Sequence, residues 1–320
     1  MKKKKILFIC SWADAHIGLF DDLKEDKRVH LTCFGLKKTN RITKFIKRIH
    51  LSQKINKIIN LPNKELWTTL PHNLSPYKSV LVTNNVLPSI TDFVNLCKKK
   101  GKEVNLFVVD AMDADSFIMK TARPLILNMK FDHIYTFEPA DVKKYGFEYL
   151  GFGGYYSKKN IDIPLTPKYD LVFTGGVKGG RQEAIVELHH FLVRTACNFY
   201  FELNSKPFFE GEHVKYYYGW IPYEDFLNTE LEGNCILEIV QKGQTGPTLR
   251  YFEAICYNKK LVTNNPHIVE FPFYNPQWMK IYQKPEDIDV DWLKKIEQID
   301  YGYNGEFSPT RLIDNLYERV

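Results

Sequence analysis

Short hydrophobic runs recur along the chain and alternate with longer segments of mixed polarity. The runs are continuous and rich in β-branched and aromatic residues, which is typical of strands buried on both faces of a parallel sheet. Helical patterns lie between them, such as 88–100, which ends at Gly101. The expected strands are residues 6–10, 29–34, 79–83, 104–109 and 133–137, followed by 169–175, 198–203, 235–240 and 260–264.

The alternation is interrupted once, near the middle of the chain. Residues 151–170 contain three glycines and two prolines without a clear period, which indicates a linker. The pattern predicts an α/β protein with two Rossmann-like domains that face each other across a cleft. The expected division is an N-terminal domain over 1–155, a linker over 156–168, a C-terminal domain over 169–306 and a final helix over 307–320.

Positive charge is concentrated in one stretch. The whole chain has a formal net charge of +6, yet residues 27–64 contain eleven Lys or Arg and no acidic residue. The remainder of the chain is therefore net negative. Such local basicity argues against a general nucleic-acid-binding surface, so we expect no nucleic-acid partner.

The most basic part of that stretch has a helical pattern. Over 41–58, Ile42, Phe45, Ile46 and Ile49 share one helical face. This face either packs on the domain core or lies on an anionic membrane surface, where each cation contributes about 1 kcal/mol. We carry residues 37–58 as the candidate membrane-binding segment. No apolar window approaches a membrane span, so the expected location is the cytoplasm, with attachment to the inner face of the membrane as an addition.

A glycine-rich segment follows the strand expected at 169–175. TGGVKGGRQE (174–183) has four glycines and two cations, and such a loop lets backbone N–H groups approach a phosphate. It has the GxxxxG spacing of a Walker loop, but Arg181 and Gln182 stand where that motif requires Lys and then Ser or Thr. The segment is either a phosphate site or a charged turn. Its candidate binding residues are Thr174, Gly175, Gly176, Lys178 and Arg181.

A second candidate anion site is QKGQTGPTLRYFEA (241–254), which predicts a loop and then a helix start. The first N–H groups of a helix are unpaired and favour an anion. Arg250 could hold a diphosphate with two donors at once, and Glu253 could accept hydrogen bonds from ribose hydroxyls. The alternative is an ordinary amphipathic helix. The candidate residues are Gln241, Gln244, Thr245, Gly246, Thr248, Arg250 and Glu253.

A turn in the second half could contact a nucleobase. YGWIPYEDF (218–226) places Trp220 and Ile221 between a glycine and a proline, ahead of a short helix. Such a loop offers backbone groups and an aromatic face. The competing interpretation is that Trp220 is a core residue.

Two acidic motifs lie in the first half. CSWADAHIG (10–18) follows the first strand directly, and Asp14 or His16 there could act as a general base in the cleft. The alternative is that the motif is a hydrogen-bonded turn. DAMDADSF (110–117) contains Asp113 and Asp115 at the DxD spacing that binds a divalent cation. We favour loop carboxylates over a metal site for the second motif, so no metal ligands are assigned.

These motifs together resemble bacterial glycosyltransferases of the GT-B fold, of the kind encoded in capsule and lipopolysaccharide gene clusters. The resemblance covers residues 130–282. It rests on DLVFTGGVKGGR, GWIPYEDFL, ILEIVQKGQTGPTLRYFEAICYNKKLVTNN, FPFYNP and FDHIYTFEPADVKKYGFEYL. It implies that the C-terminal domain holds a nucleotide-sugar donor of UDP or GDP type and that the N-terminal domain presents the acceptor. It also implies that the final helix crosses back and that no metal or other cofactor is needed.

The sequence departs from that family at one position. Many GT-B enzymes carry two glutamates eight positions apart around this loop. Glu253 matches the second, but Thr245 occupies the place of the first, with Gln244 beside it. Neutral side chains would then contact sugar or phosphate, so neither stereochemistry nor sugar preference can be transferred.

The resemblance implies a hexosyltransferase-type enzyme that moves a sugar to a hydroxyl of a glycan or lipid-linked acceptor during surface polysaccharide synthesis. Arg250, Lys178 and the glycine loop would neutralise the leaving diphosphate, and Glu253 would hold the ribose. Asp14 is the first choice of base if the enzyme inverts. The alternatives are a sugar-phosphate transferase, a nucleotide-sugar epimerase, and a non-catalytic nucleotide-sugar-binding protein of a polysaccharide assembly.

Overall fold

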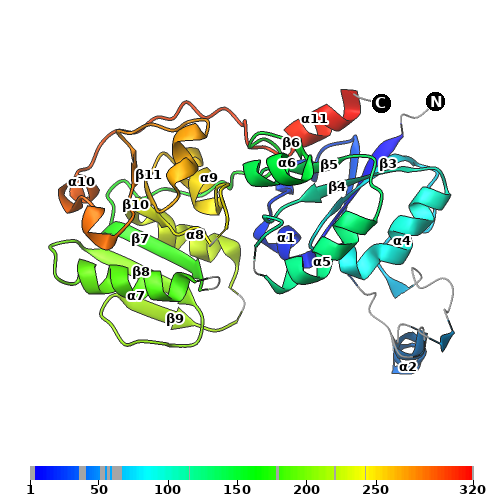
Figure 1. Ribbon diagram of the computed structural model, residues 1–320, viewed down its shortest axis with the longest axis horizontal. Helices are drawn as coiled ribbons and strands as arrows, with labels where there is room; N and C mark the ends of the chain where they lie inside the picture. Colours follow the sequence, from blue (N-terminus) through cyan, green and yellow to red (C-terminus); the bar gives the residue numbers. More distant parts are fainter. Residues whose placement is uncertain are drawn as a thin grey trace.

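The computed structural model describes residues 4–35, 41–50, 55, 58–59, 67–114, 116–177, 180–219, 221–241 and 243–318. Within them the chain forms two six-stranded sheets, which Figure 1 shows side by side with helices packed around each. All strand pairs among the described residues are parallel. The predicted fold class, two Rossmann-like α/β domains, is confirmed.

The first sheet has the order β2-β1-β3-β4-β5-β6. Its strands are β1 (Lys5–Cys10), β2 (Val29–Cys33), β3 (Tyr77–Thr83), β4 (Glu103–Val108), β5 (Ile134–Thr136) and β6 (Glu148–Tyr149). The helices of this half are α1 (Trp12–Ile17), α2 (Arg41–His50), α4 (Leu87–Lys99), α5 (Phe117–Asn128) and α6 (Pro139–Tyr145).

The second sheet has the order β12-β11-β10-β7-β8-β9. Its strands are β7 (Tyr169–Gly176), β8 (Phe199–Asn204), β9 (Val214–Tyr217), β10 (Gly233–Glu238), β11 (Lys260–Thr263) and β12 (Met279–Ile281). The helices that follow β6 are α7 (Arg181–Leu192), α8 (Tyr223–Leu231), α9 (Leu249–Cys256), α10 (Val290–Lys294) and α11 (Thr310–Glu318).

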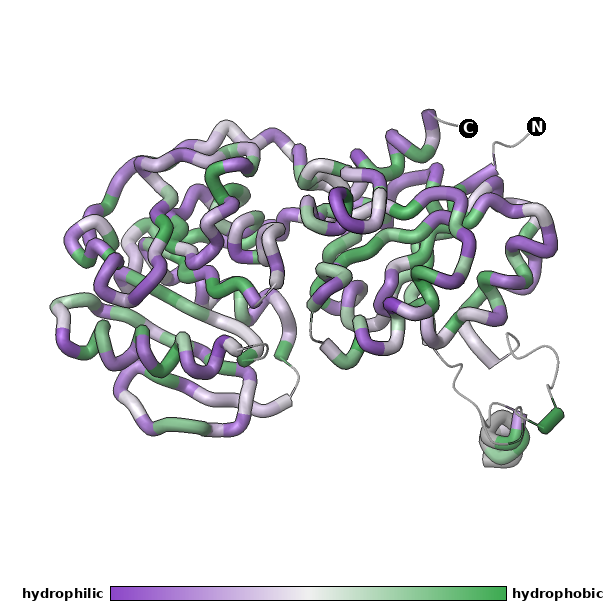
Figure 2. Tube along the Cα trace, in the orientation of Figure 1, coloured by the Kyte–Doolittle hydropathy of each residue, from purple (hydrophilic) through white to green (hydrophobic). Residues whose placement is uncertain are grey.

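Burial explains why the hydrophobic runs became strands. Residues Ile6 to Cys10 of β1 are fully buried, and all six residues of β10 are buried. Figure 2 shows the hydrophobic residues gathered on the central strands of both sheets. Helices cover both faces of each sheet, so a strand that alternated with polar residues would bury unpaired polar groups.

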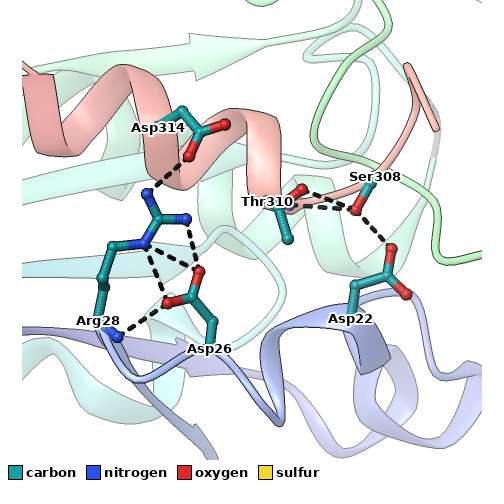
Figure 3. A network of polar contacts seen from close by, with 6 residues as sticks. All are labelled: Asp22, Asp26, Arg28, Ser308, Thr310 and Asp314. Atoms are coloured by element: carbon teal, nitrogen blue, oxygen red, sulfur yellow. Dashed lines mark hydrogen bonds and ion pairs between the residues drawn. The ribbon is translucent and has the colours of Figure 1, made fainter. Parts of the chain in front are cut away.

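The end of the chain returns to the first domain. Figure 1 shows α11 lying over the N-terminal sheet, although the preceding segment belongs to the second domain. Arg28 pairs with Asp314 at 2.7 Å and also with Asp26, and the Ser308 hydroxyl donates to Asp22 (Figure 3). The expected back-crossing helix is therefore confirmed, and it ties the two domains together.

The basic helix α2 stands away from both sheets in Figure 1. Phe45 is 67% exposed, and Ile46 and Ile49 are exposed too. The alternative in which this face packs on the domain core is therefore wrong for these side chains. Residues 37–40, 51–54 and 56–57 of the candidate membrane-binding segment lie outside the described residues. None of the helices in the described part of the chain is long and apolar enough to span a membrane.

Candidate functional site

The candidate site lies where the carboxyl ends of the two sheets face each other. In the second sheet, β7 and β10 are neighbours although their connections run in opposite directions along the sheet. Open α/β sheets bind ligands at such a topological switch point. Both motifs expected to bind phosphate begin there: one follows β7 and the other follows β10.

A cavity of about 230 Å³ opens between the domains at this point. From the N-terminal domain it is lined by the loop after β4 and by two aromatic rings. From the C-terminal domain it is lined by the ends of β7 and β10 and by the start of α9. Its polar lining residues are Asp110, Ser116, Thr174, Arg181, Gln241, Gln244, Thr248 and Arg250.

A second cavity, of about 270 Å³, adjoins the first and is more apolar. The two share Gly175, Gly176, Leu249 and Arg250 as lining residues. Either cavity alone is small for a ligand site, but together they reach the range of about 300–1,000 Å³. One extended ligand could therefore occupy both. The second cavity is lined by Trp12, Ala13, His16, Ile17, Asn204, Tyr217, Gly219, Ile221, Tyr223 and Phe226 as well.

Arg181 is the first residue of α7, and its side chain lines the first cavity. Its Nε donates to the Ile239 carbonyl at 2.6 Å and its Nη1 to the Gly176 carbonyl at 3.3 Å. Burial lowers the pKa of this guanidinium to about 10, and the neighbouring Arg250 adds to the effect. Among the described residues no carboxylate pairs with Arg181. The buried Glu238 carboxylate acts in the opposite sense without pairing with Arg181. A partly buried cation at a cavity wall whose hydrogen bonds go only to backbone carbonyls favours an anionic ligand.

Arg250 lies at the junction of the two cavities but has a different environment. Its Nη1 is 2.8 Å from Glu230 Oε2 and also pairs with Glu253, while its Nη2 donates to the Thr174 carbonyl at 2.7 Å. Burial acts to lower its pKa, yet the two carboxylates outweigh burial and hold that pKa above its usual value. Because the Arg250 guanidinium already pairs with two carboxylates, its environment favours a structural role for Arg250. The expected diphosphate contact of Arg250 remains a prediction.

Glu253 is fully buried and lines neither cavity. One carboxylate oxygen accepts a hydrogen bond from the Tyr223 hydroxyl, and the other pairs with Arg250. A ribose contact would require the carboxylate to leave both partners. The ribose contact of Glu253 remains a prediction, and its pairing with Tyr223 and Arg250 does not support it.

Two glycines give the end of β7 its shape. Gly175 has φ 141°, a conformation that L side chains rarely adopt, and a Cβ there would lie 3.4 Å from Arg250 Nη2. Gly176 has no heavy atom within 4 Å of the place where its Cβ would be. The backbone at the cavity junction is therefore open to a ligand.

The loop between β10 and α9 has two sides. Gln241, Gln244 and Thr248 line the first cavity, as expected for ligand-binding residues. Thr245 and Gly246 face the other domain, where both backbone N–H groups donate to the carboxylate of Glu138. Sequence reasoning missed Glu138, and it had no signal to find a partner more than a hundred residues away.

Asp14 was expected to face the cleft, and that expectation is wrong. It is 3% exposed and lines neither cavity. Its carboxylate accepts hydrogen bonds from the Ser11 amide at 3.1 Å, the Thr83 hydroxyl at 3.0 Å and the Asn85 amide at 2.9 Å. Asp14 therefore joins the start of α1 to the end of β3.

Asp110, and not Asp14, is the carboxylate of the first domain that lines the cavity. It follows β4 by two residues and lines the first cavity, where the Asn84 side chain donates to it at 3.3 Å. Burial raises its pKa from the ordinary value of a carboxyl group, and the nearby Asp14 adds to the effect. A cleft carboxylate with a raised pKa suits a general base. The available signal was its place directly after the strand expected at 104–109.

Other expected residues have mixed placements. His16 and Ile221 line the second cavity. Asp113 binds Lys144 and Tyr145 at the surface, while Asp115, Lys178 and Trp220 lie outside the described residues. Among the residues that the structure describes, no cluster of three His, Cys, Asp or Glu could hold a metal ion.

The sequence matches no protein-family model and no curated protein, but the fold has solved counterparts. Anabaena HepE in complex with UDP and glucose has a TM-score of 0.58 at 11% identity, over 99% of both chains. A T4 phage BGT mutant in complex with UDP-glucose has a TM-score of 0.53 at 12% identity, over 98% of this chain and 95% of that one.

The UDP-GlcNAc 2-epimerase of Methanocaldococcus jannaschii, in complex with UDP-GlcNAc and UDP, has a TM-score of 0.51 at 12% identity, over 98% of this chain and 99% of that one. At such identities the likeness establishes the fold, which is the GT-B arrangement of two Rossmann-like domains.

Proposed function

We propose that the protein is a glycosyltransferase that moves a sugar from a nucleoside diphosphate to a hydroxyl group. The observation that carries the proposal is Arg181, a partly buried cation at the switch point of the second sheet that forms no ion pair with a carboxylate of the described chain. The neighbours with UDP or a UDP-sugar bound support a nucleotide-sugar ligand for this fold.

The two cavities suit different parts of a nucleotide-sugar donor. The apolar cavity, with Tyr217, Ile221 and Phe226, suits a nucleobase and ribose. The open backbone at Gly175 and Gly176, next to Arg181, suits the diphosphate. The sugar then enters the first cavity, among the neutral side chains there.

The leaving diphosphate would be stabilised by protein groups, and we propose no metal. Arg181 and nearby backbone N–H groups are held in place before the reaction and do not need to reorganise when negative charge develops. Asp110 would accept the proton of the acceptor hydroxyl if the enzyme inverts. His16 lines the second cavity, where we place the nucleobase and ribose, so it is not proposed as the base.

The acceptor is proposed to be a glycan or a lipid-linked glycan, as in bacterial capsule or lipopolysaccharide synthesis. The exposed apolar side chains of α2 within the basic segment 37–58 support attachment to an anionic membrane at its cytoplasmic face. No nucleic-acid partner is proposed.

The membrane contact has a direct test. Changing Phe45 and Ile49 to Ser should reduce sedimentation with phosphatidylglycerol vesicles by about tenfold or more, because a buried apolar side chain contributes about 1.5–3 kcal/mol. Leu165→Ser is the matched control, since Leu165 is fully exposed on the linker. Equal binding by all three proteins would remove the membrane from the proposal.

Two other functions use the same ligand. The M. jannaschii neighbour favours a nucleotide-sugar epimerase as the second candidate, and a non-catalytic binder would keep the site without a base. Calorimetry against UDP, GDP, CMP and their sugars identifies the nucleotide. Product analysis then separates the three: a transferase releases nucleotide as it glycosylates an acceptor, an epimerase changes the sugar, and a binder does neither.

A further inference from the structure

Glu138 contacts the loop between β10 and α9 from the opposite domain. It follows β5 and caps α6, where its Oε1 accepts the Ala140 N–H at 3.3 Å. Across the interface its carboxylate accepts the Gly246 N–H at 2.8 Å, the Thr245 N–H at 3.3 Å and the Thr245 hydroxyl. Glu138 is fully buried, and no described Lys or Arg pairs with it. Its charge is therefore balanced by these N–H and O–H donors.

The closeness of this contact explains Gly246. A Cβ at that position would lie 2.9 Å from Glu138 Oε2 and 3.4 Å from the Phe137 ring. Gly246 does not have a positive φ, so its backbone conformation does not require glycine. Glycine is required because Glu138 and Phe137 of the other domain leave no room for a side chain.

The remaining contacts of the loop come from its own domain. Asn265 donates to the carbonyls of Thr245 and Gly246 at 3.0 and 3.3 Å, and both the N–H and the hydroxyl of Thr248 donate to Glu238 at 2.8 Å. These contacts fix the carbonyls and the end of the loop. Among the described residues, the Thr245 and Gly246 amides donate to Glu138 alone.

We infer that Glu138 is a positioning residue through which the N-terminal domain shapes the donor loop, so that the wall formed by Gln241, Gln244 and Thr248 is complete only when the domains are closed. If the domains separate, the Thr245 and Gly246 amides and the Thr245 hydroxyl lose Glu138 as their acceptor, and water has to replace it. The loop then keeps only the contacts that fix its carbonyls and its end, and the Thr245 and Gly246 amides are no longer held. Closure and donor binding are coupled because each favours the same loop conformation.

A competing role would be that of a built-in anion which occupies the amides in place of a donor phosphate. The geometry favours positioning, because neither Glu138 nor the Thr245 and Gly246 backbone lines the cavity. The carboxylate lies behind the wall and not in the space that a ligand would fill. The two roles predict opposite changes in affinity.

The test compares wild type with Glu138→Gln, Gly246→Ala and the double variant. Hydrogen exchange should speed up in a peptide covering 243–248 in both single variants. Where calorimetry has identified a nucleotide, its affinity should fall about tenfold in each, which corresponds to about 1.4 kcal/mol. The double variant should be little worse than either single one, because both remove the same contact. Glu148→Gln, on β6 and bonded to His133, is the control.

Unchanged exchange at 243–248 together with unchanged affinity would overturn the inference, and tighter binding by Glu138→Gln would establish the competing anion role instead. The affinity measurement rests on the proposed function, but the exchange measurement does not. A wild type that binds no nucleotide refutes the proposed function, while exchange at 243–248 still decides the role of Glu138.

Discussion

Arg181 and Arg250 both line the first cavity, at the starts of the two helices that flank the switch point, yet they are held differently. Arg250 contacts two fully buried carboxylates, whereas Arg181 contacts only backbone carbonyls. The same contrast appears with opposite charge in the first domain. Asp14 accepts three hydrogen bonds, while Asp110 lines the cavity and accepts one, from Asn84, among the described residues. A charged group that the protein already satisfies supports the fold, and one left open to a cavity is available to a ligand.

The largest expected effect is on stability. Arg250→Ala should lower the free energy of unfolding by about 3–5 kcal/mol, because it leaves Glu230 and Glu253 buried without a cation. Arg181→Ala should cost only about 0.5–1.5 kcal/mol for the strongest lost hydrogen bond. Urea denaturation of both variants measures the difference. Equal losses would show that the two arginines do not differ as described.

The second effect is on rate. Asp110→Asn should lower sugar transfer by about 10²–10⁴-fold, the usual contribution of a general base, while nucleotide affinity stays near that of wild type. Asp113→Asn is the control, since Asp113 follows in the same loop but binds Lys144 and Tyr145 at the surface. Full transfer activity in Asp110→Asn would exclude Asp110 as the base.

The pH dependence of sugar transfer provides a second test of Asp110 as the base. Asp110 must be ionised to accept a proton, so protonation at low pH removes activity. Because burial raises its pKa, the rate should begin to fall at a pH above the ordinary carboxyl value of about 4. A pH–rate profile measures this, and the acid limb should disappear in any residual activity of Asp110→Asn. An identical limb in that variant would assign the titration to another group.

Hydrophobic runs were enough to predict most of the fold. Each expected strand corresponds to an observed one, because strands buried on both faces must be apolar throughout. The strands that the pattern did not reveal are β6, β9 and β12. They are two to four residues long and lie at sheet edges, where fewer apolar positions are required.

The site was harder to predict than the fold, for a physical reason. Residue type and a helix start suggested a phosphate contact for Arg250, but the carboxylate beneath it comes from Glu230, on a different helix. Glu138 reaches the same loop from the other domain. The sequence identifies which side chains can carry a charge. Whether such a side chain is already paired within the protein depends on how distant segments pack together.

The most direct test of the central claim is calorimetry of wild type and Arg181→Ala with the nucleoside diphosphate that binds and with its nucleoside. We expect Arg181→Ala to lose about 1.5–3 kcal/mol of diphosphate affinity, the value of a charged hydrogen bond, and to bind the nucleoside as wild type does. Arg194→Ala, exposed just beyond the end of α7, should change neither. Unchanged diphosphate affinity in Arg181→Ala would contradict the account.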